Sequence, residues 1–323
     1  MDNLTHGLLG LAVGSLYRPD SRGPVAGDGT TGPAVVWGAV LAAELPDLDV
    51  FYGTSDPLSE FKYHRGLTHS FIFAPVVAAV ATAIVKIFFR RARVGPVYAF
   101  SLLAVLLAHI TADLWTGWGT MSLLPFSPVR LGLDWVNIID PIMLAILLAG
   151  AVYALRRPQA RRRALTMALA LTLAYVGVRG TVHTLFEHQV AGRYQGAAKM
   201  AVWPGMNPIG EWEYVAQVGD QYATGRVGFR RGVVEQARVA VPDAQDPAVA
   251  AALASSDLAP LFRFTAFPVV TDERIAGGGT RLAVSDLKYG YFRFGVVLDA
   301  AGHVALISQP RHGFTNPPAR SGS

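Results

Sequence analysis

The stretch YHRGLTHS occupies residues 63–70, and a long apolar run starts directly after Ser70. It holds two imidazoles, His64 and His69, on either side of a glycine that lets the backbone turn. A serine or threonine before such a run is typical of a helix N-cap, so we expect His64 in a tight loop and His69 at the mouth of a membrane-spanning helix. Neutral imidazole is the commonest protein ligand for zinc and similar ions. The stretch therefore suggests metal ligands, with a polar loop carrying two solvated histidines as the alternative.

The composition is typical of a membrane protein. Of the 323 residues, 52% are hydrophobic and 16% are charged, and the mean hydropathy is +0.34. The charged fraction is well below the roughly 25% of soluble domains. There is no cysteine, which excludes Cys-rich zinc sites, disulfide frameworks and thiol nucleophiles. The net charge of +5 does not indicate nucleic-acid binding, because the arginines cluster beside apolar runs. The first residues lack the basic start of a signal peptide, so we expect insertion through internal helices.

Six apolar runs follow one another in the first part of the chain. They cover residues 4–17, 33–45, 71–89, 95–112, a segment from about 140 to 156, and one from about 164 to 183. The last four, at about 18–21 residues, are long enough to span a bilayer, whereas the first two have only about 14 residues each. We therefore expect a membrane bundle of about six α-helices, the first two short, over residues 1–188.

The composition changes after residue 188. Apolar and polar residues alternate between residues 200 and 310, with turn signals at Gly219-Asp220 and around Asp299–Gly302, which predicts antiparallel hairpins. We expect a small antiparallel β-rich domain over residues 189–315 and a disordered tail over 316–323.

Charge orients the predicted helices. Ten arginines occupy the loops after the first, third and fifth runs, whereas the opposite loops hold three basic residues, Lys62, Arg65 and Arg130. By the positive-inside rule, the arginine-rich loops face the cytoplasm, which indicates a protein integral to the inner or plasma membrane. Eight polar residues then fall at the outer ends of their helices: His6, Asp47, Asp49, His64, His69, His109, Asp113 and Asp140. We expect these residues and the C-terminal domain on the extracytoplasmic side.

Two pairs within this set have informative spacings. His109 and Asp113 are four residues apart in a predicted helix, which places them on one face. An ionised aspartate at membrane depth is costly unless it is paired or metal-bound, so this pair indicates ligands; a helix-end carboxylate that reaches water is the alternative. Asp47 and Asp49 flank Leu48 after a proline, and side chains two apart in an extended chain point the same way. Two solvated loop acids would give the same pattern.

Other positions have more than one interpretation. His6 lies in the opening turn of the first helix, where a lone histidine is more often structural. Asp140 precedes a proline and is as well explained as a helix N-cap as by metal ligation. His183 and Glu187 are four apart at an outer helix end, and the sequence leaves their role open. Arg65 could clamp a phosphate or stabilise an oxyanion, or it could pair with a nearby aspartate.

The number of imidazoles and carboxylates exceeds what one mononuclear site needs. Catalytic zinc sites use three protein ligands plus water, so a two-metal centre fits the count better, with bridging carboxylates and one ion that lowers the pKa of bound water. The donor types suit Zn, Mn or Fe without choosing among them. We expect one or two divalent ions, with Zn as the first candidate. The predicted ligands are His6, Asp47, Asp49, His64, His69, His109, Asp113 and Asp140.

The motifs together resemble a known family. LTH at residues 4–6, LPDLD at 45–49, HRGLTHS at 64–70 and the pair His109 and Asp113 are similar to the YdjM-type membrane-bound metal-dependent hydrolases, over roughly residues 1–155. The resemblance implies an integral membrane protein with a hydrolytic His/Asp metal site, and every ligand predicted above except Asp140 falls on its motifs. More distantly, the helical His-x-x-x-Asp and His-x-x-x-Glu spacings are similar to zinc-dependent phospholipase C enzymes, which slightly favours phosphoesters.

We therefore expect a metal-dependent hydrolase whose metal-activated water attacks a lipid or lipid-linked phosphoester at the outer membrane face. Asp47 or Glu44 is the candidate general base, and Arg65 is the candidate group that stabilises negative charge developing on the substrate. Hydrolysis of a lipid amide or peptide is the first alternative. A non-enzymatic transporter, sensor or scaffold that binds metal is the second, although the apolar centres of the third to sixth runs argue against a transport path. The expected partners are the bilayer and a lipid-like substrate, with no nucleic acid.

Overall fold

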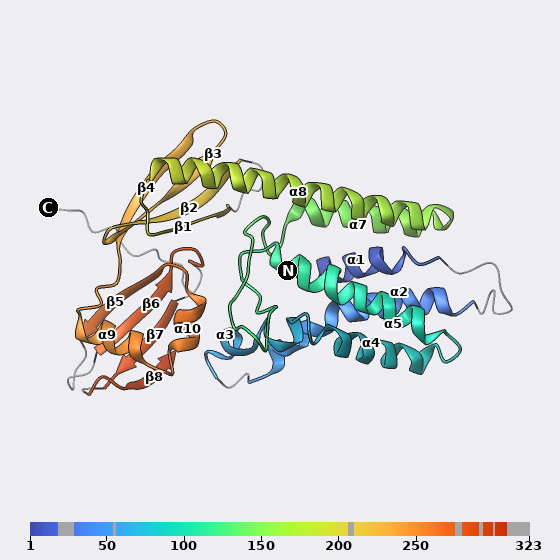
Figure 1. Ribbon diagram of the computed structural model, residues 1–323, viewed down its shortest axis with the longest axis horizontal. Helices are drawn as coiled ribbons and strands as arrows, with labels where there is room; N and C mark the ends of the chain where they lie inside the picture. Colours follow the sequence, from blue (N-terminus) through green and yellow to red (C-terminus); the bar gives the residue numbers. More distant parts are fainter. Residues whose placement is uncertain are drawn as a thin grey trace. The chain divides into compact units, whose positions relative to one another are not determined.

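The computed structural model describes residues 1–18, 29–53, 56–205, 210–274, 280–290, 293–299 and 301–308. The chain folds into two compact units. The first unit comprises Met1–Tyr52 and Tyr63–His183, and the second comprises Gly53–Lys62 and Thr184–Ser323. The first unit is helical and the second contains the strands (Figure 1).

The helices of the first unit follow the predicted apolar runs. They are α1 (Asn3–Gly14), α2 (Thr31–Glu44), α4 (Ala74–Phe88), α5 (Val94–Leu103), α6 (Thr111–Leu114), α7 (Pro141–Arg156) and most of α8 (Arg161–Arg193). A π-helical turn, η3 (Ala104–Ile110), joins α5 to α6. Short 3-10 helices lie at η1 (Leu45–Phe51), η2 (Leu67–His69) and η4 (Pro158–Ala160). The predicted cap at Ser70 is wrong in detail, because α4 begins at Ala74 and the Ser70 hydroxyl accepts the Phe73 N–H, 3.3 Å away, in the turn before the helix.

Small residues let α1 and α2 approach closely. A Cβ atom on Gly10 would lie 2.8 Å from the Ala39 carbonyl oxygen and 2.9 Å from the Ala43 Cβ, and one on Gly14 would lie 2.9 Å from the Val36 Cα. Glycine and alanine at such contacts are the usual means by which helix backbones pack tightly in membrane proteins. This contact places the start of α1 next to the end of α2, where the candidate site lies.

Two helical stretches are long and apolar enough to cross a membrane, Val94–Leu114 and Pro158–Arg193. They correspond to the fourth and sixth predicted runs. A third candidate arises if Ser59–His69 and Ala74–Phe88, joined by a sharp bend, are one broken span, and α7 is shorter. By length and composition, the described helices thus supply two crossings, or three with the bent pair; the six-helix bundle remains a prediction.

The second unit contains two four-stranded antiparallel sheets. The first has the order β1 (Lys199–Pro204), β2 (Glu211–Val218), β3 (Gln221–Gly228) and β4 (Gly232–Ala240), and the second has the order β5 (Pro268–Arg274), β6 (Thr280–Asp286), β7 (Arg293–Leu298) and β8 (Val304–Ser308). The predicted hairpins are confirmed, with left-handed glycines in the β2–β3 and β7–β8 turns at Gly219 and Gly302. The helices α9 (Pro247–Ala254) and α10 (Ala259–Phe264) were not predicted. The predicted disordered tail, 316–323, lies outside the described residues.

A short segment from the first part of the chain belongs to the second unit. It contains most of α3 (Ser59–Tyr63). Leu58, just before this helix, and Phe61 within it are 0% and 4% exposed. The Phe61 ring packs against Phe264 at 4.7 Å and Phe294 at 5.4 Å between centroids. Leu58 and Phe61 are therefore part of the core of the β-rich unit.

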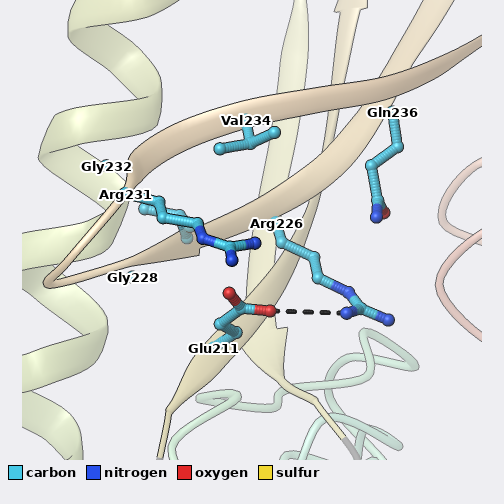
Figure 2. A pocket seen from close by; sticks show the side chains of 8 residues that line it. Glu211, Arg226, Gly228, Arg231, Gly232, Val234 and Gln236 are labelled. Atoms are coloured by element: carbon cyan, nitrogen blue, oxygen red, sulfur yellow. Dashed lines mark hydrogen bonds and ion pairs between the residues drawn. The ribbon is translucent and has the colours of Figure 1, made fainter.

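A small hollow of about 60 Å³ opens on the first sheet, between β2, β3 and β4 (Figure 2). The Glu211 carboxylate accepts a hydrogen bond from Arg226 across it at 3.3 Å, and both side chains are exposed. Such an exposed pair contributes little to stability. The hollow has room for a few water molecules and no buried charge, so we assign it no function.

Candidate metal centre

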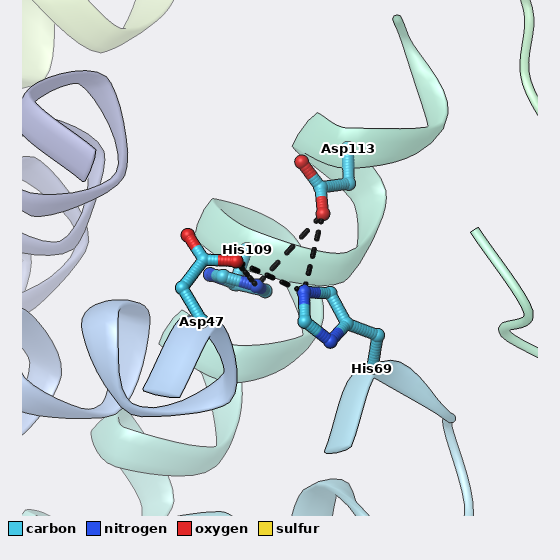
Figure 3. Close-up of side chains that lie close together, drawn as sticks. All are labelled: Asp47, His69, His109 and Asp113. Atoms are coloured by element: carbon cyan, nitrogen blue, oxygen red, sulfur yellow. Dashed lines mark hydrogen bonds and ion pairs between the residues drawn. The ribbon is translucent and has the colours of Figure 1, made fainter. Parts of the chain in front are cut away.

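Imidazoles and carboxylates from separate segments meet inside the helical unit. Asp47 comes from η1, His69 from η2, His109 from η3 and Asp113 from α6, and one ligand atom from each lies within 4.8 Å of the others (Figure 3). All four side chains are buried. His6 of α1 joins them, with its Nε2 3.3 Å from Asp113 Oδ1 and 3.9 Å from Asp47 Oδ2.

Backbone carbonyls set the tautomers of two histidines. His6 Nδ1 lies 2.8 Å from the Ala108 carbonyl oxygen, and His109 Nδ1 lies 2.6 Å from the Ala43 carbonyl oxygen. A carbonyl only accepts, so each Nδ1 carries the proton and donates it, and each Nε2 of a neutral ring presents a lone pair. Within the described part of the chain, neither Nε2 makes a hydrogen bond. The two rings also stack with centroids 4.0 Å apart, an arrangement that favours neutral imidazoles over two cations.

His69 is oriented in the same way by a carboxylate. Its Nδ1 lies 3.2 Å from Asp49 Oδ2 and 3.0 Å from Thr68 Oγ1, and the Thr68 hydroxyl donates to Asp49 Oδ2 at 2.8 Å. With the proton on Nδ1, the His69 Nε2 lone pair points toward Asp47 Oδ1 at 3.1 Å and Asp113 Oδ2 at 3.5 Å. This is the arrangement in which a carboxylate orients a metal-binding histidine from behind.

These atoms fit a divalent cation. Three imidazole lone pairs and the carboxylates of Asp47 and Asp113 face one another. The Met1 ammonium and Arg65 offset the charge of Asp113 at its Oδ1, and a cation between the remaining donors would relieve their mutual repulsion. The separations between the Nε2 atoms and the carboxylate oxygens range from 3.1 Å to 3.9 Å. For comparison, ligand atoms about 2.0–2.1 Å from a tetrahedral zinc are about 3.3 Å apart. Asp113 Oδ2 is a further buried atom without a hydrogen bond among the described residues. The donor set is therefore complete for one metal ion.

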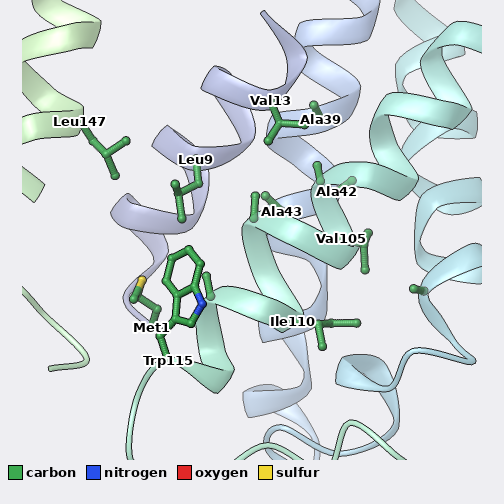
Figure 4. Close-up of a cluster of buried hydrophobic side chains, with 14 of the residues drawn as sticks. Met1, Leu9, Val13, Ala39, Ala42, Ala43, Val105, Ile110, Trp115 and Leu147 are labelled. Carbon is green, nitrogen blue, oxygen red and sulfur yellow. The ribbon is translucent and has the colours of Figure 1, made fainter. Parts of the chain in front are cut away.

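The apolar core around the cluster keeps it dry. Leu9 of α1, Ala42 and Ala43 of α2, and Ile110 of η3 are at most 1% exposed (Figure 4). Charged and polar groups interact more strongly in such surroundings than in water. The packing of α1, α2 and η3 thus positions the imidazoles and strengthens their interactions.

Asp47 and Asp49 remain ionised in the structure. Burial raises the pKa of Asp47, but the hydrogen bond with His69 and the nearby imidazoles outweigh burial and hold this pKa below its ordinary value. Burial likewise raises the pKa of Asp49, and the contacts with His64 and His69 more than compensate, so its pKa is also lowered. Both carboxylates are therefore available as anionic acceptors near neutral pH.

Arg65 holds Asp113 in place. Its guanidinium forms an ion pair through Nη2 with Asp113 Oδ1 at 3.1 Å and donates through Nη1 to Thr116 Oγ1 at 3.0 Å, and the residue is 3% exposed. Its backbone has a φ of +58°, a conformation that a non-glycine residue rarely adopts, and its N–H donates to Asp49 Oδ2 at 3.2 Å. Of the two interpretations of Arg65, the structure contains the ion pair with an aspartate. The buried Met1 N-terminal ammonium contacts the same Oδ1 of Asp113, and Oδ2 is left facing the cluster.

A second group of possible ligands is formed by Asp49, His64 and His69. His64 Nδ1 donates to Asp49 Oδ1 at 2.7 Å. This group uses Nδ1 of His69, whereas the first group uses Nε2, and a neutral imidazole has only one lone pair. Each group could therefore hold an ion at the same time only if the neutral His69 ring also lost its remaining N–H proton. The geometry favours one ion in the first group, with Asp49 as the acceptor that orients His69.

The remaining predicted residues lie outside both groups. Asp140 caps α7, accepting the N–H groups of Ile142 and Met143 at 3.1 Å, and both its oxygens accept from the Tyr175 hydroxyl at 3.0 Å. These hydrogen bonds support Asp140 as the N-cap of α7. Metal ligation by Asp140 stays a prediction. His183 and Glu187 are partly exposed on α8.

Glu44 ends α2 near the start of α1. Its carboxylate accepts hydrogen bonds from the Asn3 side chain and the Gly7 N–H, and burial raises its pKa to about 7. A Cβ atom on Gly7 would lie 2.7 Å from Glu44 Oε1, so the carboxylate sits where a larger side chain would be. Glu44 therefore exchanges protons near neutral pH beside the helix turn that carries His6.

Sequence reasoning missed the groups that orient the ligands. The carbonyls of Ala43 and Ala108 have no sequence signal at all. Thr68 and Thr116 are polar residues near the motifs, but nothing in the sequence assigns their partners. The π-helical turn around His109 was also not predicted, although such turns occur frequently at functional sites.

Comparison with known proteins agrees with the motifs. The family model described as YdjM inner membrane protein matches residues 1–186, which include every residue of the cluster. This chain belongs to the YdjM inner membrane protein family. The YdjM family chain is also 30% identical over 155 residues to the uncharacterized protein YfhP of Bacillus subtilis (strain 168), a match that covers 47% of this chain and 46% of that protein. The chain thus matches about half the length of this relative, and no solved structure matches it.

Proposed function

We propose that this YdjM family protein is a membrane-embedded, metal-dependent hydrolase that acts on a lipid or lipid-linked phosphoester. The observation that carries the proposal is the convergence of three imidazole Nε2 atoms and two carboxylates in a buried cluster. The two protein cations at the cluster, Arg65 and the Met1 N-terminal ammonium, both contact Oδ1 of Asp113, and Oδ2 has no hydrogen bond among the described residues. A bound divalent ion, with zinc favoured and manganese or iron as alternatives, would supply Lewis acidity and lower the pKa of a water molecule.

The residues of the chain have distinct roles in this proposal. Five side chains hold the ion: His6, Asp47, His69, His109 and Asp113. Asp49 orients His69 and Arg65 orients Asp113, which fixes the donors before the ion binds. Glu44 is the better candidate general base, because Asp47 faces the donor set and because the Glu44 pKa of about 7 suits proton transfer near neutral pH.

Exposed apolar side chains beside the ligands support a lipid-like substrate. Leu48 and Phe51 of η1 are 56% and 73% exposed, and Leu67, Phe71 and Ile72 flank His69 with exposures of 40–52%. Apolar side chains gathered at one exposed place mark contacts with membranes or apolar ligands. A substrate with acyl or prenyl chains would pack on these residues while its polar linkage reaches the cluster.

The arginine-rich loops support an orientation in the inner membrane. We propose that these loops face the cytoplasm, with the cluster and the second unit on the extracytoplasmic side, because basic residues are concentrated on one set of loops. Labelling of single introduced cysteines in the cysteine-free chain tests this orientation directly. A cysteine in place of Arg91 should react only after the membrane is permeabilised, and one in place of Phe126, which is 81% exposed, should react in intact cells.

The proposal is tested by metal content and hydrolysis together. The purified protein should hold about one divalent ion per chain, which His109→Ala should lose and His303→Ala, an exposed histidine of the second unit, should retain. The wild type should then cleave a lipid phosphoester, and a lipid amide of the same chain length distinguishes the alternative reaction. Absence of metal in wild type, or its retention in His109→Ala, would refute the donor set. A metal-loaded protein without activity on either substrate would instead support the binding scaffold.

A further inference from the structure

Arg179 is a buried charge of the helical unit that the proposed reaction does not use. It lies on α8, in the stretch Pro158–Arg193 that is long and apolar enough to cross a membrane, and it is 5% exposed. Ionisable side chains in such helices are costly to bury, and they frequently mark functional contacts. Arg179 contacts a segment that precedes α7, residues 133–140, which we call the strap. Arg179 and the strap both belong to the first unit.

The Arg179 side chain holds the strap against α8. Its Nε donates a hydrogen bond to the Trp135 carbonyl at 3.1 Å. The Trp135 ring lies on the next residue of α8, because a Cβ atom on Gly180 would be 3.0 Å from two of the ring carbons. Asp140, fully buried at the end of the strap, accepts from the Tyr175 hydroxyl one helical turn before Arg179. The negative charge of Asp140 also attracts the guanidinium.

The strap is hydrogen-bonded to the end of α6. The N–H groups of Trp135 and Val136 both donate to the Trp115 carbonyl, at 2.9 Å and 3.2 Å. The Leu133 N–H donates to the carbonyl of the residue before Trp115 at 2.8 Å. These two acceptors directly follow Asp113, whose carboxylate belongs to the metal cluster. The position of the strap therefore influences where the Asp113 carboxylate lies.

The strap also contacts the start of α1. The Ile138 carbonyl accepts the Asp2 N–H at 3.2 Å. Asp2 is the N-cap of α1, where its side chain accepts the Thr5 N–H at 3.0 Å and its carbonyl accepts the His6 N–H at 3.1 Å. One segment thus contacts two ligand-bearing elements, α6 with Asp113 and α1 with His6.

We propose that Arg179 is a positioning residue of the metal centre, which fastens the strap to α8 and thereby fixes Asp113 and His6. The inference rests on the metal centre of the proposed function, but it does not depend on hydrolysis. It gives α8, which carries none of the five proposed ligands, a role at the site. Separating the strap from α8 should loosen Asp113 and His6 while Asp47 and His69, which the strap does not contact through these hydrogen bonds, keep their places.

Hydrogen exchange and metal binding of the full chain, purified in detergent, test the proposal. Arg179→Met removes the donor and the charge but keeps an unbranched side chain. The reporter amides are those of Leu133, Trp135 and Val136, which should exchange faster in this variant with or without metal. Zinc binding should weaken about 2–30-fold, the range for residues that act on a site through intervening contacts. The visible absorption bands of bound cobalt(II), which depend on the geometry of its ligands, should change.

Two further variants keep the proposal testable if Arg179→Met does not fold. Arg179→Lys retains a cation, and its ammonium can donate to the same carbonyl, so it should restore most of the exchange protection and zinc affinity. Gly180→Ala leaves every charge in place but pushes the Trp135 ring away from α8. It should therefore change the reporter amides and the cobalt(II) bands in the same direction as Arg179→Met.

The matched control is another glycine at a close contact of α8. A Cβ atom on Gly150 of α7 would overlap the Ala168 Cβ of α8, so Gly150→Ala should lower the unfolding temperature. Because this contact does not involve the strap, the reporter amides and the cobalt(II) bands should stay as in wild type.

Two results would overturn the proposal. One is that Arg179→Met and Gly180→Ala lower the unfolding temperature without changing the reporter amides or metal binding, since Arg179 would then only stabilise α8. The other is that Gly150→Ala changes these readouts as much as Gly180→Ala does. Wild type that binds no zinc would refute the metal centre, and this inference with it. Equal zinc affinity in wild type and Arg179→Met would refute the positioning role alone.

Discussion

Replacing Asp49 by asparagine separates an orienting carboxylate from a metal ligand. In the structure Asp49 accepts from His64 Nδ1 at 2.7 Å, Thr68 Oγ1 at 2.8 Å, Arg65 N at 3.2 Å and His69 Nδ1 at 3.2 Å. Three of these donors meet at Oδ2, so the amide oxygen of asparagine should take that position. The amide nitrogen then faces His64, which can accept by changing its tautomer. The turn should keep its shape while His69 loses the negative charge behind its ring.

The magnitude follows from this single lost charge. Removing a group that orients a metal-binding histidine typically costs 10–100-fold in affinity, or about 1.4–2.8 kcal/mol. Asp49→Asn should therefore bind zinc measurably, but more weakly than wild type. Asp47→Asn, which alters a carboxylate in the donor set, should lose far more.

Competition with a chromophoric chelator at fixed pH measures both affinities. The unfolding temperature without metal is the control that each variant is folded. The reasoning is refuted if Asp49→Asn abolishes binding as completely as Asp47→Asn, because Asp49 would then be a ligand itself. Unchanged affinity in Asp49→Asn would refute its orienting role.

Three further predictions concern packing, proton exchange and capping. Gly10→Ala should push α1 from α2, lower stability by about 1–3 kcal/mol and weaken metal binding, whereas Gly32→Ala, with no atom within 4 Å, should change little in thermal unfolding. The pKa of Glu44 in the folded protein, about 7, lies above its value in the unfolded chain, so the stability that Glu44 contributes is present in acid and is lost as pH rises through 7. Glu44→Gln lacks this loss, and its unfolding temperature should therefore rise relative to that of wild type between pH 5 and 8. The hydrolytic activity of wild type should increase through pH 7, and that of Glu44→Gln should not. Asp140→Ala should lower stability by about 0.5–2 kcal/mol, since α7 loses its cap and Tyr175 its acceptor, and should retain metal; loss of metal would instead make Asp140 a ligand.

Much of the candidate site could be predicted because burying a charged or polar side chain in an apolar helix costs free energy unless the side chain has a partner. An aspartate or histidine within an apolar run needs a partner, so His109 and Asp113 indicated a site by composition alone. Their four-residue spacing also placed them on one face, and the structure brings them together with Asp47 and His69. The β-hairpins were predictable for a similar local reason, because turn residues interrupt alternating strands.

The distinction between ligands and orienting groups could not be predicted in the same way. Asp47 and Asp49 are chemically identical and two residues apart, yet one faces the donor set and the other the back of His69. In the 3-10 helix η1 a two-residue step reverses much of the direction of a side chain, whereas the extended chain assumed from sequence does not. The assignment therefore depended on a local conformation that the flanking residues do not specify.

The sequence by itself determined the class of the protein, the set of possible donor residues and the positions of most helices and hairpins, because hydrophobic periodicity and the cost of buried charge act locally. Only the tertiary structure decided which nitrogen of each histidine is free, because the carbonyls of Ala43 and Ala108 reach His109 and His6 across helix contacts 66 and 102 residues apart in the chain. It also decided that residues 53–62 belong to the β-rich unit, since the burial of Phe61 depends on Phe264 and Phe294, more than 200 positions away. Such long-range contacts arise from packing, which no local pattern records.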